Sequence, residues 1–247
     1  MRASAFAREA PPSPQWTDRR ATSPEADSSL ETPNVPSPEL QLYIDADFFS
    51  PYAFSAFVAV SEKGLPFELR PLNLAAGENL AAGFAELSLT CRIPTLVHGD
   101  FSLSESSAIA EYLDEVFPTP PIYPREPRAR ARARQVQAWL RTDLLPLREV
   151  RSTEVVFIGP TDVPLGTRAQ AAVARLLAVA EALLPPGGRH LFGEWSIADA
   201  DLALMLNRLV RNGDPVPARI ADYARGQWQR PSIQSWVERF RQAHAQG

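Results

Sequence analysis

Apolar and polar positions follow different patterns in different parts of the chain. Residues 1–39 have almost no apolar periodicity and are rich in proline, serine, threonine and alanine, which predicts a disordered tail. Residues 40–118 mix short alternating runs with helical spacing, and residues 119–127 are rich in proline, which indicates a linker. Residues 128–247 carry helical spacing. The pattern therefore predicts an α/β domain followed by an all-α domain.

Four apolar runs in the first domain predict strands, at residues 40–45, 67–72, 95–98 and 101–103. Pro71 favours a sheet edge or a strand end for the second run. The polar turn His98-Gly99-Asp100 predicts a hairpin between the last two runs. Helices are predicted from Ser50 to near Gly64, within residues 75–87, and from Glu105 to Phe117. The resulting order, β-α-β-α-β-β-α, is the thioredoxin-like arrangement.

The second domain begins with a stripe of apolar positions that predicts one long helix over residues 128–150, formed by Val136, Trp139, Leu140, Leu144 and Leu147. A second stripe on another face of this helix consists of Arg130, Arg134, Arg141 and Arg148. We expect a solvated face whose arginines pair with acids; an anionic substrate, a nucleic acid or a partner subunit are the alternatives. Further helices are predicted over residues 167–184, around residues 198–209 and after Pro231.

A capping box precedes the helix around residues 198–209. Ser196 and Asp199 stand at the spacing at which each side chain can satisfy a backbone N–H of the other, with aspartate in place of the more usual glutamate or glutamine. We interpret this element as structural, needed for folding and without a role in chemistry.

The candidate chemistry lies at the starts of two predicted helices. Ser50 is a preferred N-cap residue, and Pro51 after it is preferred at the first helical position. Glu105 and Ser106 open a second helix, where free backbone N–H groups and a serine hydroxyl suit a carboxylate. The neighbouring carboxylate of Glu105 suits an ammonium group. Together these groups suit the α-amino-acid end of a small zwitterion.

Two motifs carry a resemblance to a known family. Ile93-Pro94 followed by Glu105-Ser106 resembles the glutathione site of thioredoxin-fold glutathione S-transferases, and Asp47-Phe48-Phe49-Ser50-Pro51-Tyr52 resembles bacterial members of the serine type. The resemblance implies that Ile93 pairs its backbone with the peptide of glutathione, beside a cis Pro94. It also implies that Glu105 and Ser106 hold the γ-glutamyl group.

The resemblance assigns the catalytic role to Ser50, whose hydroxyl would donate a hydrogen bond to the sulfur of glutathione and favour the thiolate. The alternative is that Ser50 only caps its helix. Arg92 would approach the glutathione carboxylates, with a solvated surface charge as the alternative. Trp139 is a weak candidate for a wall of the acceptor pocket, since a tryptophan at such a position is more often core.

The activity implied is that of a homodimeric, cytoplasmic glutathione S-transferase in detoxification. The thiolate of its co-substrate glutathione attacks a small electrophile in an apolar pocket at the domain junction, and peroxide reduction is a second activity. The alternative from another class is a non-catalytic glutathione-binding or assembly module of the same fold.

Composition limits the classes of binding partner and the cellular compartment that we expect. The formal net charge of −4 over 247 residues argues against nucleic-acid binding, and no apolar run approaches membrane-spanning length. Cys91 is the single cysteine, which excludes an internal disulfide and a Cys-x-x-Cys motif; we interpret it as structural or incidental, with redox activity as the alternative. The three histidines lack metal-ligand spacing, so no metal is expected. We expect a soluble, intracellular protein.

Overall fold

The computed structural model describes residues 40–245 of the 247-residue chain. The tail predicted over residues 1–39 lies outside the described residues. Within them, no helix is both long enough and apolar enough to span a bilayer.

A mixed four-stranded sheet forms the base of the α/β half, in the order β2-β1-β3-β4. Its strands are β1 (Leu40–Asp45), β2 (Phe67–Leu72), β3 (Thr95–His98) and β4 (Phe101–Ser104). β1 runs parallel to β2 and antiparallel to β3, and β3 and β4 form the predicted hairpin. Pro71 lies on the edge strand β2, where its missing N–H costs no ladder bond.

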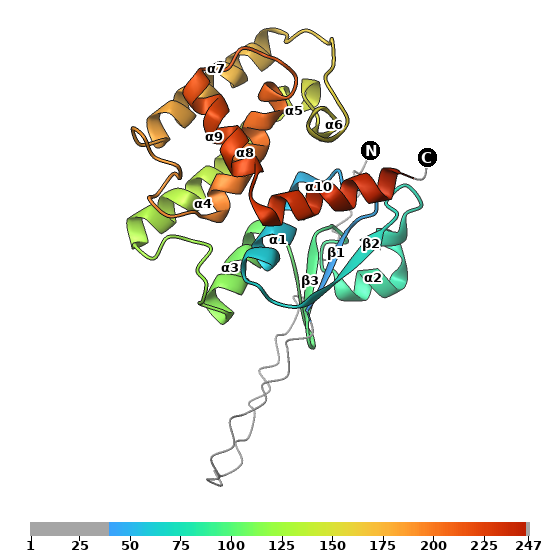
Figure 1. The fold of residues 1–247 in the computed structure, drawn as a ribbon. Helices are drawn as coiled ribbons and strands as arrows, with labels where there is room; N and C mark the ends of the chain where they lie inside the picture. The colour runs from blue at the N-terminus through green and yellow to red at the C-terminus, as the bar shows by residue number, and fades with distance from the viewer. Residues whose placement is uncertain (1–39, 246–247) are drawn as a thin grey trace, which may run out of the picture. The chain divides into compact units, whose positions relative to one another are not determined.

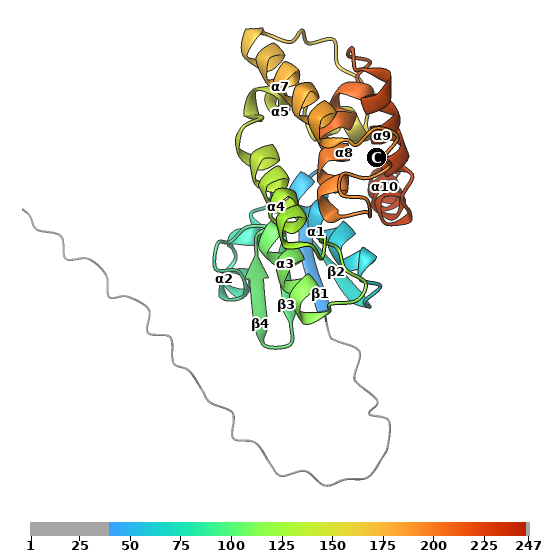
Figure 2. The same ribbon diagram turned by 90° about the vertical axis from the view of Figure 1, so that its left-hand side faces the viewer.

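Alternation along β1 decides which helices cover which face of the sheet. Leu40, Leu42 and Ile44 are buried on the face of β1 that α1 covers, and α3 contacts β3 and β4. The ring of Tyr43 points the other way, 5.4 Å from that of Phe84 in α2. The helices are α1 (Pro51–Glu62), α2 (Ala82–Leu87) and α3 (Ser106–Val116), with a 3₁₀ turn, η1 (Glu78–Leu80), before α2. Figures 1 and 2 show this arrangement.

The remaining helices form the α-helical half: α4 (Pro127–Thr142), α5 (Leu145–Val150), α6 (Thr153–Phe157), α7 (Thr167–Leu183), α8 (Ile197–Val210), α9 (Ala218–Trp228) and α10 (Pro231–His244). α8 is buried from Ile197 to Leu209 and packs against α4, α9 and α1 (Figure 1). The predicted fold class, a thioredoxin-like domain followed by an all-α domain, is confirmed.

The single helix predicted over residues 128–150 is wrong. The chain leaves the helical conformation at Leu144, so α4 and α5 are separate. The reason is Pro146, which has no backbone N–H and whose ring would clash with the carbonyl of Thr142 in a continuous helix. Two further helices, α6 and α9, were not predicted from the sequence.

The capping box before α8 is confirmed. The backbone N–H of Ser196 donates to Asp199 Oδ2 at 2.9 Å. Oδ1 of the same carboxylate accepts from the backbone N–H of Leu191 at 2.8 Å and from the hydroxyl of Tyr223 at 2.9 Å. Burial raises the pKa of Asp199, and these hydrogen bonds act against that rise. Asp199 thus also anchors the loop before α8 and the helix α9.

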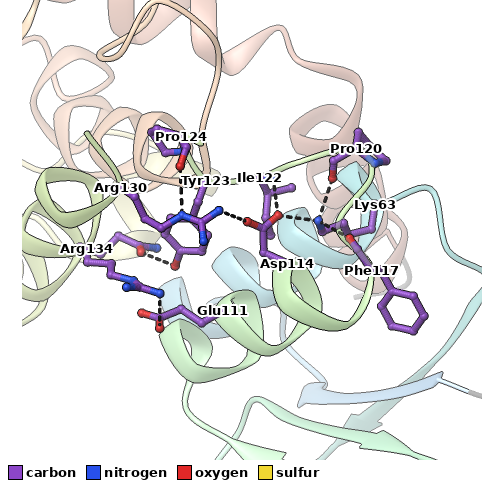
Figure 3. Close-up of polar contacts among 11 residues, drawn as sticks. Lys63, Glu111, Asp114, Phe117, Pro120, Ile122, Tyr123, Pro124, Arg130 and Arg134 are labelled. Carbon is purple, nitrogen blue, oxygen red and sulfur yellow. Dashed lines mark hydrogen bonds and ion pairs between the residues drawn. The ribbon is translucent and has the colours of Figure 1, made fainter. Parts of the chain in front are cut away.

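A buried lysine ties α1 to the stretch between α3 and α4 (Figure 3). Lys63 Nζ donates to Asp114 Oδ1 at 2.6 Å and to the carbonyls of Phe117 and Pro120, both at 2.7 Å. The backbone N–H of Ile122 donates to the same Asp114 oxygen at 2.8 Å. We call these five residues the linker clasp. All three ammonium hydrogens are used, which satisfies the buried charge.

Among residues 40–245, three of the four arginines in the stripe, all except Arg148, pair with acids, but the stripe does not form the solvated face that we expected. Arg130 lies 3.3 Å from Asp114 and Arg134 lies 2.9 Å from Glu111, so both contact α3 (Figure 3). Arg141 is only 18% exposed and packs between α1, α3 and α8. The stripe therefore joins the helical half to the α/β half.

Candidate active site

A cavity of about 640 Å³ lies at the N-terminal end of α1, where the end of β1 meets the loops before β3 and α3. Its lining includes five of the residues singled out from the sequence: Ser50, Arg92, Ile93, Pro94 and Glu105. Another cavity of the same volume lies beside α9 and is lined by none of them. Residues that are more than fifty positions apart in the sequence thus line one cavity.

Ser50 is the N-cap of α1, as its residue type and the following proline predict. Its Oγ accepts a hydrogen bond from the backbone N–H of Ala53 at 3.1 Å. A hydroxyl has two acceptor lone pairs and one hydrogen, so this bond leaves the hydrogen of Ser50 free to donate. The capping role and a donor role toward a ligand are therefore compatible.

The carboxylate of Asp45 fixes the backbone that presents Ser50. Asp45 Oδ2 accepts from the backbone N–H groups of Phe49 at 2.6 Å and Ser50 at 3.0 Å. The side chain is 5% exposed, and burial raises its pKa while the two N–H groups oppose that rise. Asp45 was not predicted as a site residue, although an acid that ends an otherwise apolar strand was a visible signal.

The loop before β3 contributes backbone to the cavity. The Ile93–Pro94 peptide bond is cis and Pro94 is buried. Arg92 is exposed and lines the same cavity. Cys91 is partly exposed, with its carbonyl accepting from Asn79 Nδ2 at 2.9 Å.

Glu105 and Ser106 lie side by side in sequence but face different surroundings. Glu105 is exposed, lines the cavity and adopts φ +75°, a conformation that L-residues rarely take outside functional sites and tight turns. Ser106 is only 2% exposed, and its Oγ accepts from Arg141 Nη2 at 3.1 Å. The hydroxyl of Ser106 is thus held by the helical half, and Ser106 does not line the cavity.

Trp139 lies apart from the cavity lining. It is partly buried on α4, and its indole Nε1 donates to Asp143 Oδ2 at 3.1 Å. Among residues 40–245, no group of three or more histidine, cysteine, aspartate or glutamate side chains is placed to hold a metal ion.

Comparison with known proteins gives matches over both halves of the chain. A family model for the glutathione S-transferase N-terminal domain matches residues 49–116, and one for the C-terminal domain matches residues 126–241. A crystal structure of a glutathione transferase homolog from Burkholderia (BGR1), with bound glutathione, is 45% identical in sequence. That match covers 83% of this chain and 98% of the other, with a TM-score of 0.68.

The curated relatives match over shorter stretches. Human glutathione S-transferase theta-1 is 36% identical over 106 residues, which is 42% of this chain and 43% of that protein. A zeta-class glutathione S-transferase from Euphorbia esula is 32% identical over 123 residues, which is 50% of this chain and 53% of that protein. The chain thus aligns with about half the length of these relatives.

Proposed function

The chain belongs to the glutathione S-transferase family, and we propose that its α1 cavity binds glutathione and activates the thiol for attack on a small electrophile. One observation carries this proposal. Ser50, at the positive end of α1, shares a cavity with the cis Ile93–Pro94 loop and the strained Glu105. These are the groups that the family resemblance assigns to the thiol, the peptide and the γ-glutamyl end of glutathione.

Glutathione would bind along the edge of the cavity. The backbone of Ile93 pairs with its peptide, and the carboxylate of Glu105 binds its ammonium group. Glu105 and Ser106 begin α3, whose free N–H groups favour the carboxylate of the γ-glutamyl end. Arg92 is near enough to the cavity to bind a glutathione carboxylate.

Ser50 would act on the thiol without becoming a nucleophile. The thiol gives its proton to solvent, and the Ser50 hydroxyl donates to the resulting thiolate, whose charge also lies at the positive end of the α1 dipole. The thiolate then attacks the electrophilic atom, forming a thioether as the leaving group departs with its electron pair.

We also propose peroxide reduction by the same thiolate. Attack on a peroxide oxygen breaks the O–O bond and gives an alcohol and the sulfenic acid of glutathione. A second glutathione then forms the disulfide and releases water. The family resemblance further supports a homodimer in the cytoplasm with a role in detoxification; sizing chromatography tests the oligomeric state.

Ser50→Ala separates activation from binding. We expect glutathione binding, measured by calorimetry, to stay within a few-fold of wild type, while kcat falls by about a hundredfold, as for loss of a donor to a developing anion. The matched control is Ser152→Ala, which removes the N-cap serine of α6, a residue that does not line the cavity.

Three other results would decide against parts of this proposal. Equal kcat in wild type and Ser50→Ala would leave Ser50 as a cap only. Binding of glutathione without turnover of any electrophile or peroxide would favour the non-catalytic module. Absence of glutathione binding would contradict the assignment of the cavity.

A further inference from the structure

A third, much smaller cavity is formed by the first turn of α1 together with α4, α5 and α8. Its volume is about 30 Å³. Its polar lining consists of Tyr52, Arg141, Arg148, Asp201 and Arg208, and we call it the arginine pocket. The remaining lining is apolar apart from backbone.

The charges around the arginine pocket do not balance. Asp201 is its single acid, and Asp201 Oδ2 already accepts from Arg141 Nη2 at 3.1 Å and from Gln137 Nε2 at 2.7 Å. Within the described part of the chain, neither Arg148 nor Arg208 forms an ion pair, although Arg208 is only 3% exposed. Buried charges are normally paired. Burial, and to a smaller extent the nearby charge of Arg148, lower the pKa of Arg208 to about 10.

The same side chains also carry unused hydrogen-bond donors. The Nε atoms of Arg141, Arg148 and Arg208 are buried, and none of them has an acceptor among residues 40–245. A buried donor without an acceptor is costly, and each such group in a native protein calls for an explanation. A carboxylate offers two oxygens that together accept about four hydrogen bonds.

The size and place of the arginine pocket fit one end of a ligand. A cavity of about 10–15 Å³ holds one water molecule, so 30 Å³ accommodates a group of the size of a carboxylate. Tyr52 lines both this pocket and the larger cavity, and Pro51 directly follows Ser50. The arginine pocket and the larger cavity are therefore neighbours at the first turn of α1.

We propose that the acceptor substrate is a small carboxylate, whose anionic end binds the arginine pocket while its electrophilic atom lies beside Ser50. This inference rests on the proposed function, because it names the class of acceptor. Arg148 is the residue that sets the charge preference. Its Nη1 donates to the hydroxyl of Tyr52 and its Nη2 to the carbonyl of Arg141, both at 2.8 Å, which holds the guanidinium against the first turn of α1.

The test measures binding, so it does not depend on turnover. The probes are 3,5-dinitrobenzoate and its methyl ester, which share a ring, lack a leaving group and differ in charge. Calorimetry gives the Kd of each for the full chain, without glutathione and with saturating S-methylglutathione. We expect the carboxylate to bind wild type at least about tenfold more tightly than the ester, as hydrogen bonds to a charged group do.

Variants test which residue causes the preference for the carboxylate over the ester. Arg148→Gln should lose most of it, and Arg148→Lys should retain part, because the charge stays while the planar fork of donors is lost. Arg175→Gln is the matched control, since Arg175 is a 52% exposed arginine on α7 paired with Asp143. It should leave both affinities unchanged. Circular dichroism and the thermal midpoint of each variant confirm that it is folded.

The outcomes separate this inference from the proposed function. Equal affinity of wild type for the two probes, or an equal loss for both in Arg148→Gln, would overturn the inference. Displacement of 3,5-dinitrobenzoate by acetate at equal concentration would make the pocket a site for simple anions and would also overturn it. Failure of S-methylglutathione to bind would overturn the proposed function alone, because the charge preference is also measured without it.

Discussion

At the scale of the residue, the position of Ser50 depends on Asp45, whose side chain binds backbone groups and takes no part in the proposed chemistry. Asp45 accepts the N–H groups of Phe49 and Ser50, and thereby fixes the backbone just before α1. The Ser50 hydroxyl is in turn fixed by the N–H of Ala53. Two contacts from Asp45 and one from Ala53 therefore fix the backbone and the oxygen of Ser50, and its hydroxyl hydrogen remains to donate.

Asp45→Ala removes the acceptor for both N–H groups. We expect a loss of about 1–3 kcal/mol in the free energy of unfolding, as for buried groups left without a partner, together with a fall in kcat/KM because Ser50 is no longer held. Asp100→Ala, which removes an exposed acid in the β3–β4 turn that does not line the cavity, is the control. Urea unfolding and initial rates measure the two effects. An Asp45→Ala protein as stable and as active as the control would show that this carboxylate is dispensable.

Asp45→Asn tests how the free energy of unfolding depends on pH. The pKa of Asp45 is raised above its ordinary value of 3.8, so the folded chain binds this proton more tightly than the unfolded chain. The contribution of Asp45 to stability is then largest below 3.8 and decreases as the pH rises through the raised pKa. We expect the unfolding free energy of wild type to fall relative to that of Asp45→Asn as the pH rises from 3.8 through the raised pKa of Asp45. A constant difference across that range would contradict the raised pKa.

The residues of the site differ in how far the sequence reveals them. Ser50, Ile93-Pro94 and Glu105 stand next to helix starts or prolines, which are local signals, and the structure places them around one cavity. Asp45 acts through backbone groups, and its one local signal is the position of an acid at the end of a strand. The bond from Arg141 to the Ser106 hydroxyl joins residues 35 positions apart, and no local pattern encodes such a contact.

At the scale of the element, helix ends organise the molecule. α1 and α3 begin at the cavity, and α8 begins at a carboxylate that serves several backbone and side-chain donors. The starts of strands and helices can be predicted from the sequence, because alternating apolar residues, N-cap residues and prolines are local signals. Pro146 is a visible break signal that outweighs the continuous apolar stripe of residues 128–150, because a backbone clash cannot be relieved by side-chain packing.

The substitution Asp199→Ala measures how much the capping carboxylate of α8 contributes to the free energy of unfolding. It leaves the N–H groups of Leu191 and Ser196 and the hydroxyl of Tyr223 buried without their acceptor. We expect the free energy of unfolding to fall by about 3 kcal/mol or more, at about 1–3 kcal/mol for each such group. Asp222→Ala, which removes a 73% exposed partner of Arg225, should cost about 0–1 kcal/mol. Urea unfolding of the two variants gives the comparison, and similar losses would count against the anchoring role.

At the scale of the whole molecule, the two halves are joined by buried polar contacts as well as by apolar packing. The linker clasp ties α1 and α3 to the chain that leads into α4, and Glu62 accepts from Arg230 at 2.6 and 2.7 Å near the start of α10. The order of strands and helices follows from the sequence, because alternation is local. The pairing of Lys63 with Asp114 joins residues 51 positions apart and only the folded chain reveals it.

Lys63→Met breaks the linker clasp at its centre. The carbonyls of Phe117 and Pro120 lose their donor, and Asp114 keeps only the N–H of Ile122 and the more distant Arg130. We expect a loss of about 3–5 kcal/mol in the free energy of unfolding, as for removal of one partner of a buried ion pair. Arg225→Gln, at the exposed pair with Asp222, is the control. Thermal and urea unfolding measure both, and a Lys63→Met protein as stable as the control would refute the clasp.

The central claim is that Ser50 stabilises the thiolate of bound glutathione. The most direct measurement is a pH titration of the thiolate absorbance of glutathione bound to wild type and to Ser50→Ala. We predict a thiol pKa in wild type well below that of free glutathione, and a rise of about one unit or more in the variant, equivalent to at least about 1.4 kcal/mol. The same thiol pKa in both proteins would contradict the account.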